Sequence, residues 1–151
     1  MSSTTTNTEQ LAALVAAKQQ VLEILVRLSQ RQVEVIDAGD MTLLMKLLAG
    51  KHTVMSQLQT IERELAPFRD QDPDQRIWRS PGERTACQAR AEQCNTLLAE
   101  AMELERRAEA AMLDRRDAAA VALAAIQIGS DAKAAYAAMG PASSASLQVE
   151  G

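Results

Sequence analysis

Apolar residues recur three and four positions apart from the first long segment of the chain onward. They comprise Leu11, Leu14, Val21, Leu25, Leu28 and Val35, widened by Val15, Leu22 and Ile36 and interrupted by Lys18 and Gln32. This spacing is typical of a helix that packs along its length against another helix. We predict a helix over residues 8–38, with Asn7 or Thr8 as its N-cap.

Gly39 and Asp40 interrupt this repeat, and a second repeat begins directly after them. Glycine readily adopts the left-handed conformation that ends many helices, and aspartate is a favoured N-cap. The second stripe reads Met41, Leu44, Leu48, Lys51, Met55, Leu58, Ile61 and Leu65. We therefore predict a helix over 40–66, antiparallel to the first because the connection is short. Gly50, inside it, indicates a close approach or a bend.

The stretch "FRDQDPDQRIWRSPGER", after Pro67, combines prolines with many charges and predicts a loop. Within it, Trp78 is expected to fold back over the end of the helices, the alternative being contact with a partner. A third helix is predicted over 83–128, since no helix breaker follows until Gly129. A short fourth helix over 130–139, capped by Ser130 or Asp131, can follow it.

These elements predict an all-α fold: an antiparallel three-helix bundle or helical hairpin with a long C-terminal helix and possibly the short fourth helix. One domain is expected over 8–139, between a flexible segment at 1–7 and a disordered tail at 140–151. Aromatic residues make up only 2% of the chain, so the core must be built from aliphatic, Met and Ala packing. Cys87 and Cys94 would lie about 10.5 Å apart along one helix, too far for a disulfide, which predicts reduced thiols.

Charge and segment length restrict the partners and the location of the protein. The net charge of -4 gives no general attraction to nucleic acid or to an anionic membrane. The least polar segment, 118–128, is shorter than the roughly 20 residues of a membrane-spanning helix. The first residues, "MSSTTTNTEQ", lack the basic and apolar regions of a secretory signal. We expect a soluble cytoplasmic protein.

No catalytic, metal-binding or cofactor-binding pattern stands out in the sequence. His52 is the only histidine, and acidic pairs such as Glu62 and Glu64 are two residues apart, which on a helix separates their directions. Glycines form no phosphate-binding cluster. We therefore predict no enzyme activity, no metal and no cofactor.

The end of the third helix is the candidate partner-binding surface, because its apolar residues would be costly to leave exposed along a whole face. The surface consists of Ala111, Met112, Ala118, Val121, Ala122, Ala125 and Ile126. Such a face can receive a partner helix, and methionine can repack around different partners. An internal antiparallel contact or a homodimer contact is the alternative.

The helical layout resembles the FlgN family of flagellar type III export chaperones. The resemblance spans about residues 10 to 140. The matching features are Gly39-Asp40, Leu43-Leu44, Leu47-Leu48, Lys51, the segments "CNTLLAEAMELERR" and "AAYAAMG", and the charged loop before a long third helix. An Ala-heavy third helix and the Trp78 loop depart from the family.

The resemblance implies a non-enzymatic chaperone in the cytoplasm. Family members bind C-terminal helical segments of hook-filament junction proteins, keep them from associating early and deliver them to the export gate. Tyr136 resembles the aromatic residue that such chaperones present to the gate. The rival hypothesis is a structural coiled-coil protein that self-associates and has no export client. A metal or redox bundle is a third hypothesis.

Overall fold

The computed structural model describes the backbone of residues 2–150 and the side chains of residues 7–139. Within that part of the chain the fold is all-α, as predicted. Its elements are α1 (Ser2–Ala38), α2 (Met41–Arg69), the short 3₁₀ helix η1 (Pro73–Gln75) and α3 (Pro81–Glu150). The chain divides into two compact units, Met1–Ala111 and Met112–Gly151, and the domain predicted over 8–139 spans both.

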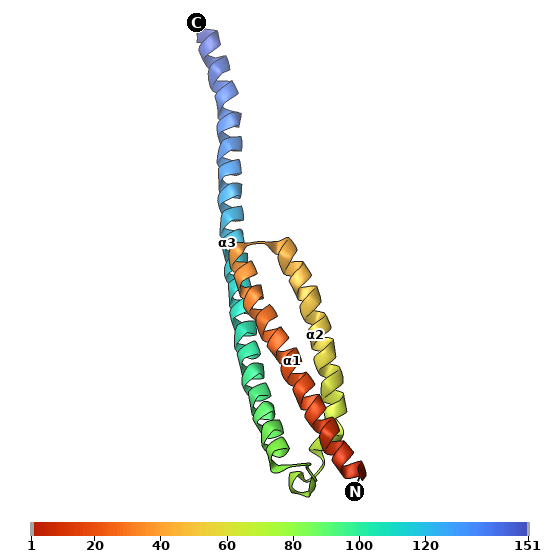
Figure 1. The fold of residues 1–151 in the computed structure, drawn as a ribbon. Helices are drawn as coiled ribbons and strands as arrows, with labels where there is room; N and C mark the ends of the chain where they lie inside the picture. Colours follow the sequence, from red (N-terminus) through yellow and green to blue (C-terminus); the bar gives the residue numbers. More distant parts are fainter. Residues whose placement is uncertain (1, 151) are drawn as a thin grey trace. The chain divides into compact units, whose positions relative to one another are not determined.

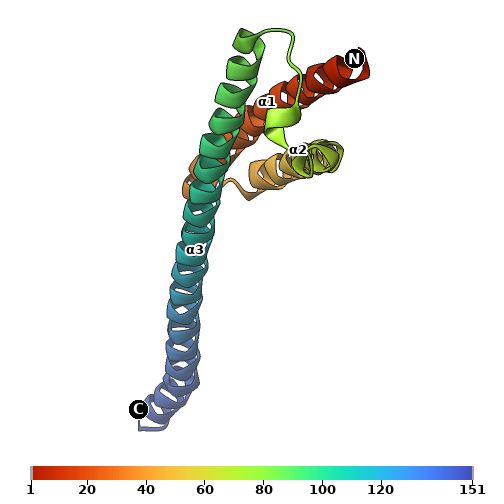
Figure 2. The same ribbon diagram turned by 90° about the horizontal axis from the view of Figure 1, so that it is seen from below.

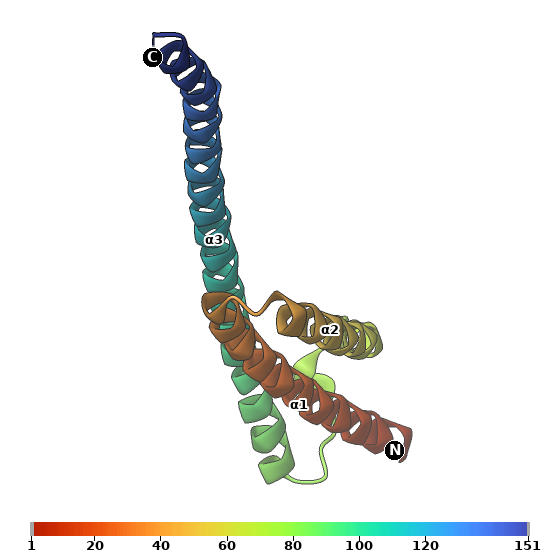
Figure 3. The ribbon, with the colours of Figure 1, turned by 90° about the horizontal axis from the view of Figure 1, so that it is seen from above.

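In the first unit, α1 and α2 run antiparallel, and α1 lies between α2 and the early part of α3 (Figures 1, 2 and 3). The central position of α1 explains why it buries polar residues, Ser29 and Gln32, as well as its apolar stripe. Leu22 and Ile36 of α1 have no exposed surface. Each such residue stabilises the fold by about 1.5–3 kcal/mol relative to an exposed one.

The core of this unit consists of three clusters, and each of them draws residues from α1, α2 and α3. One end holds Leu11, Leu14, Val15, Leu65, Phe68 and Cys87; the middle holds Leu22, Leu25, Val26, Val54, Leu58, Cys94, Leu97, Ala101 and Leu104; the other end holds Val35, Ile36, Leu44, Leu47 and Ala108. The aliphatic and Ala part of the predicted core is thus confirmed, whereas the three clusters contain Phe68 and two cysteines in place of the expected methionines. The first unit is a three-helix bundle.

The predicted junction at Gly39-Asp40 is also confirmed. Gly39 has a left-handed backbone with φ 77°, and its N–H donates to the Ile36 carbonyl at 3.0 Å. The Asp40 carboxylate accepts a hydrogen bond from the Leu43 N–H at 3.0 Å, so Asp40 caps α2. These bonds satisfy backbone groups that the two helix ends would otherwise leave unpaired.

Gly50 shows no close approach, because a Cβ placed there meets no atom within 4 Å. Helix α2 also continues through Pro67 to Arg69, three residues beyond the predicted end. A proline in the last turn removes only one hydrogen bond of the helix.

Helix α1 starts earlier than predicted, and Thr8 has a different role from the expected cap. Thr8 is 3% exposed, and its hydroxyl donates to the Ile77 carbonyl at 2.8 Å. This bond ties the loop after α2 to α1. The neighbouring Trp78 packs against the first core cluster, as predicted for a residue that folds back over the helix ends.

Helix α3 begins two residues earlier than predicted and does not end at Gly129. Pro81 is its first residue, and the Ser80 hydroxyl accepts a hydrogen bond from the Glu83 N–H at 3.2 Å. The predicted helix end at Gly129 and the separate helix over 130–139 are wrong, because α3 is continuous to Glu150. A glycine in a helix costs only about 1 kcal/mol, and alanines on both sides outweigh it.

Asp131 therefore does not begin a new helix. Its carboxylate accepts a hydrogen bond from the Gln127 side chain one turn earlier, at 3.0 Å. The predicted flexible segment at 1–7 and tail at 140–151 fall almost entirely on residues whose side chains lie outside the described part of the chain. Both stay predictions. No helix in the described residues is long and apolar enough to cross a membrane.

Candidate functional site: two apolar surfaces

The first apolar surface is the predicted one, in the second unit. Every described residue from Met112 to Met139 is exposed. Val121, Ile126 and Tyr136 are 71%, 68% and 82% exposed. No charged residue occurs between Asp117 and Asp131. A helix that is apolar around its whole circumference is normally covered in a folded protein, so this segment has the character of a binding surface.

Within the predicted set, Met112, Ala118, Val121, Ala122, Ala125 and Ile126 are all exposed. Ala111 is the exception, because it is half-buried against the core cluster of Val35 and Ala108 in the first unit. The small side chain of Ala111 fits where α3 packs closely on the other helices. Leu123 and Ile128 belong to the exposed segment although the sequence analysis omitted them.

The second apolar surface is a groove between α2 and α3 in the first unit, with α1 as its floor. Its middle part has a volume of about 410 Å³. The lining residues of the middle part are Leu25, Ser29, Leu48, Lys51, His52, Met55, Leu98, Ala101, Met102 and Glu105. Leu48, Met55 and Leu98 are 37–40% exposed and Met102 is 63% exposed. Four large apolar side chains therefore face outward around one depression.

A second cavity, of about 240 Å³, continues the groove toward the loop after α2. It is lined by Leu11, Val15, Lys18, Leu65, Phe68, Arg69, Arg76, Ala91, Cys94 and Asn95. The α1 residues that line the cavities are Leu11, Val15 and Lys18 in one and Leu25 and Ser29 in the other. With the fully buried Leu22 between them, they are spaced alternately four and three residues apart. Residues at this spacing share one helix face. The two cavities therefore follow the same face of α1, over about 27 Å from Leu11 to Ser29, and together are called the groove.

Charged residues form ion pairs at two places along this groove. In the middle cavity, the Lys51 ammonium pairs with Glu105 across from α2 to α3 and donates to Gln32 Oε1 at 2.9 Å. At the other end, Glu62 accepts from Lys18 at 2.7 Å and also pairs with Arg69. Burial raises the pKa of Glu62, but these two cations outweigh it and hold the pKa below its ordinary value.

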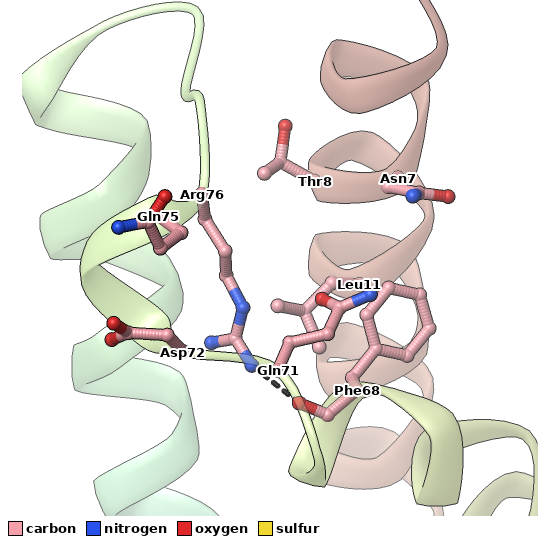
Figure 4. A pocket seen from close by; sticks show the side chains of 8 residues that line it. All are labelled: Asn7, Thr8, Leu11, Phe68, Gln71, Asp72, Gln75 and Arg76. Atoms are coloured by element: carbon pink, nitrogen blue, oxygen red, sulfur yellow. Dashed lines mark hydrogen bonds between the residues drawn. The ribbon is translucent and has the colours of Figure 1, made fainter.

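Two buried polar side-chain atoms in the described residues have no hydrogen-bond partner, Ser29 Oγ and Arg76 Nε. Both residues line the groove. Figure 4 shows the Arg76 side chain reaching from the loop toward the end of α2, where one guanidinium nitrogen donates to the Phe68 carbonyl at 2.6 Å. Buried polar groups are nearly always paired in folded proteins, so these two atoms distinguish the groove from the rest of the bundle.

The two cysteines are buried, and Cys94 also lines the second cavity of the groove. Both are free thiols, as predicted, and burial raises the pKa of each above its ordinary value. The Cys94 sulfur lies 3.8 Å from the Val15 carbonyl oxygen, and Cys87 packs in the end cluster. These are the positions of small core residues.

Comparison with known proteins identified no relative of the chain: no family model, no curated protein and no solved structure matches it.

Proposed function

We propose that this protein is a cytoplasmic flagellar export chaperone that binds C-terminal helical segments of hook-filament junction proteins. The carrying observation is the exposed stretch from Ala118 to Ile128, which has no charged residue and no cover among the described residues. A partner helix that packs on this stretch would remove its apolar surface from water. The resemblance of the helical layout to the FlgN family supports the choice of client.

The client would contact the face that contains Met112, Val121 and Ile126, and Tyr136 would be available to a component of the export gate. Tyr136 is 82% exposed, so a gate protein could reach its ring without rearranging the helix. The thioether of Met112 provides a contact that can adapt to clients of different sequence.

The test is calorimetric titration of a junction-protein C-terminal peptide into the full chain. We expect Met112→Glu with Ile126→Glu to abolish binding, because two charges on the face would have to be buried without partners. The matched control is Ile24→Glu with Met45→Glu, which makes the same change at exposed positions of the first unit, 40% and 68% exposed. If the double variant keeps its helicity and binds the peptide as tightly as the unmodified protein does, this face is not the client-binding surface.

Self-association is the second candidate function, and a specific pattern favours it. The residues Ala118, Val121, Ala125, Ile128, Ala132, Ala135 and Met139 are spaced alternately three and four apart. This is the seam of a coiled coil, and its alanines allow close approach of a second helix. Light scattering separates the two functions: stable oligomers that ignore junction-protein peptides would favour a structural protein.

A further inference from the structure

The groove between α2 and α3 is a separate feature from the exposed segment of the second unit. It has two apolar walls, provided by Leu48 and Met55 on α2 and by Leu98 and Met102 on α3. In each wall the residues lie on one helix face, since they are seven or four apart. Two parallel apolar ridges on either side of Leu25 and Ser29 form a groove in which one further helix can pack.

The charges at one end of the groove are unbalanced. Lys18, Arg69 and Arg76 line the cavity there, and Glu62 is the carboxylate that pairs with the first two. Asp72 lines a neighbouring cavity together with Arg76, but its carboxylate accepts a hydrogen bond from the Asp74 N–H at 3.0 Å and forms no ion pair with Arg76. Among the described residues, Arg76 thus has an unpaired buried Nε and no carboxylate partner, and its guanidinium donates to the Phe68 carbonyl. A guanidinium in this state is suited to a charge-assisted bond with a carboxylate.

We propose that the groove binds an amphipathic helix of another protein whose C-terminal end carries carboxylates. The apolar stripe of that helix would lie on the two ridges, and its acidic end would meet Arg76. The orientation follows from charge, because the C-terminal end of a helix is its negative pole and the cationic end of the groove attracts it. The helix would therefore run in the direction of α2, which also ends beside Arg76.

Ser29 adds a second point of recognition. Its hydroxyl oxygen is buried in the floor of the middle cavity without a hydrogen-bond partner. Ser29 and Val15, which lines the cationic end of the groove, are about 21 Å apart along α1. A serine, threonine or amide side chain about four turns before the acidic end would reach the Ser29 hydroxyl. This inference does not depend on an export function, because it concerns a different unit and different residues.

The test uses two synthetic peptides of about 20 residues, matching the groove length. Both carry leucines at helical spacing; one ends in two glutamates with a free carboxylate, and the other ends in two glutamines with an amide. Trp78, the only tryptophan, lines a neighbouring cavity together with Arg76 and Leu11, which also line the groove, so we expect its fluorescence to change when a peptide binds at the cationic end. We expect the acidic peptide to bind about tenfold more tightly than the neutral one.

Arg76→Gln should abolish the difference between the two peptides, whereas Arg79→Gln, in the same loop but outside the groove, should keep it. Met55→Glu should weaken both peptides, and Met45→Glu, on the same helix, should weaken neither. The proposal is overturned if the acidic peptide does not bind saturably, or if both peptides bind equally to the unmodified protein. It is also overturned if Trp78 fluorescence changes with protein concentration alone, since a second copy would then occupy the groove.

Discussion

Replacing glycine by alanine should have opposite effects at two positions of the first unit. Gly39 has φ 77°, a conformation that costs an alanine roughly 1–2 kcal/mol. Reduced freedom of the unfolded chain offsets part of this cost, so Gly39→Ala should lower the free energy of unfolding by about 1 kcal/mol. Gly50 lies inside α2 with no atom within 4 Å of an added Cβ. Gly50→Ala should raise the free energy of unfolding by about 0.5–1 kcal/mol.

Urea unfolding followed by Trp78 fluorescence measures these changes in the first unit alone, because Trp78 packs against a core cluster there. The two variants should differ by roughly 1.5–2 kcal/mol. Gly129→Ala is the matched control, since Gly129 belongs to the second unit and its change should leave the Trp78 transition in place. A stabilising Gly39→Ala would refute the role of the left-handed turn, and a destabilising Gly50→Ala would refute the open space at Gly50.

Two further predictions follow from titrating groups. Because the folded state lowers the pKa of Glu62, its stabilising effect is present above the ordinary value of about 4.3 and is lost as the pH falls through the lower folded value. Acid titration should accordingly destabilise Glu62→Gln less than the unmodified protein; equal loss would contradict the role of the Lys18 and Arg69 pairs. Burial raises the pKa of both thiols, so stability should fall as the pH rises above the ordinary value of about 8.5, where unfolded thiols ionise first. Both thiols should react slowly with a disulfide reagent until urea unfolds the chain, and fast reaction of the folded protein would show that they are accessible.

Local signals in the sequence were sufficient for much of the fold. Gly39 and Asp40 predict the turn because a left-handed glycine and an aspartate cap are both local features. The Ser80-Pro81-Gly82-Glu83 stretch contains a signal that the sequence analysis overlooked: serine followed three residues later by glutamate is typical of a helix start. Recognising it would have placed the start of α3 correctly. The predicted helix end at Gly129 was wrong because the surrounding alanines favour the helix more strongly than one glycine opposes it.

The groove could not be predicted, because it depends on which helix lies in the middle. The apolar stripes of α2 and α3 are visible in the sequence, but only their packing on α1 leaves Met55 and Met102 uncovered. The unpaired state of Ser29 Oγ and Arg76 Nε is likewise a property of the packed bundle. The pattern of a single sequence shows that a residue is apolar or charged. It does not show whether neighbouring residues cover an apolar side chain or form a hydrogen bond with a polar one.

The exposure of every described residue from Met112 to Met139 also determines how this segment responds to heat. Its helix has no tertiary contacts among these exposed side chains to hold it, and isolated helices of this kind are only marginally stable in water. Warming should therefore erode its helical signal gradually, while the first unit melts in a sharp transition. A bound partner would convert the gradual loss into a cooperative one, so the shape of the melting curve would itself report whether the segment is occupied.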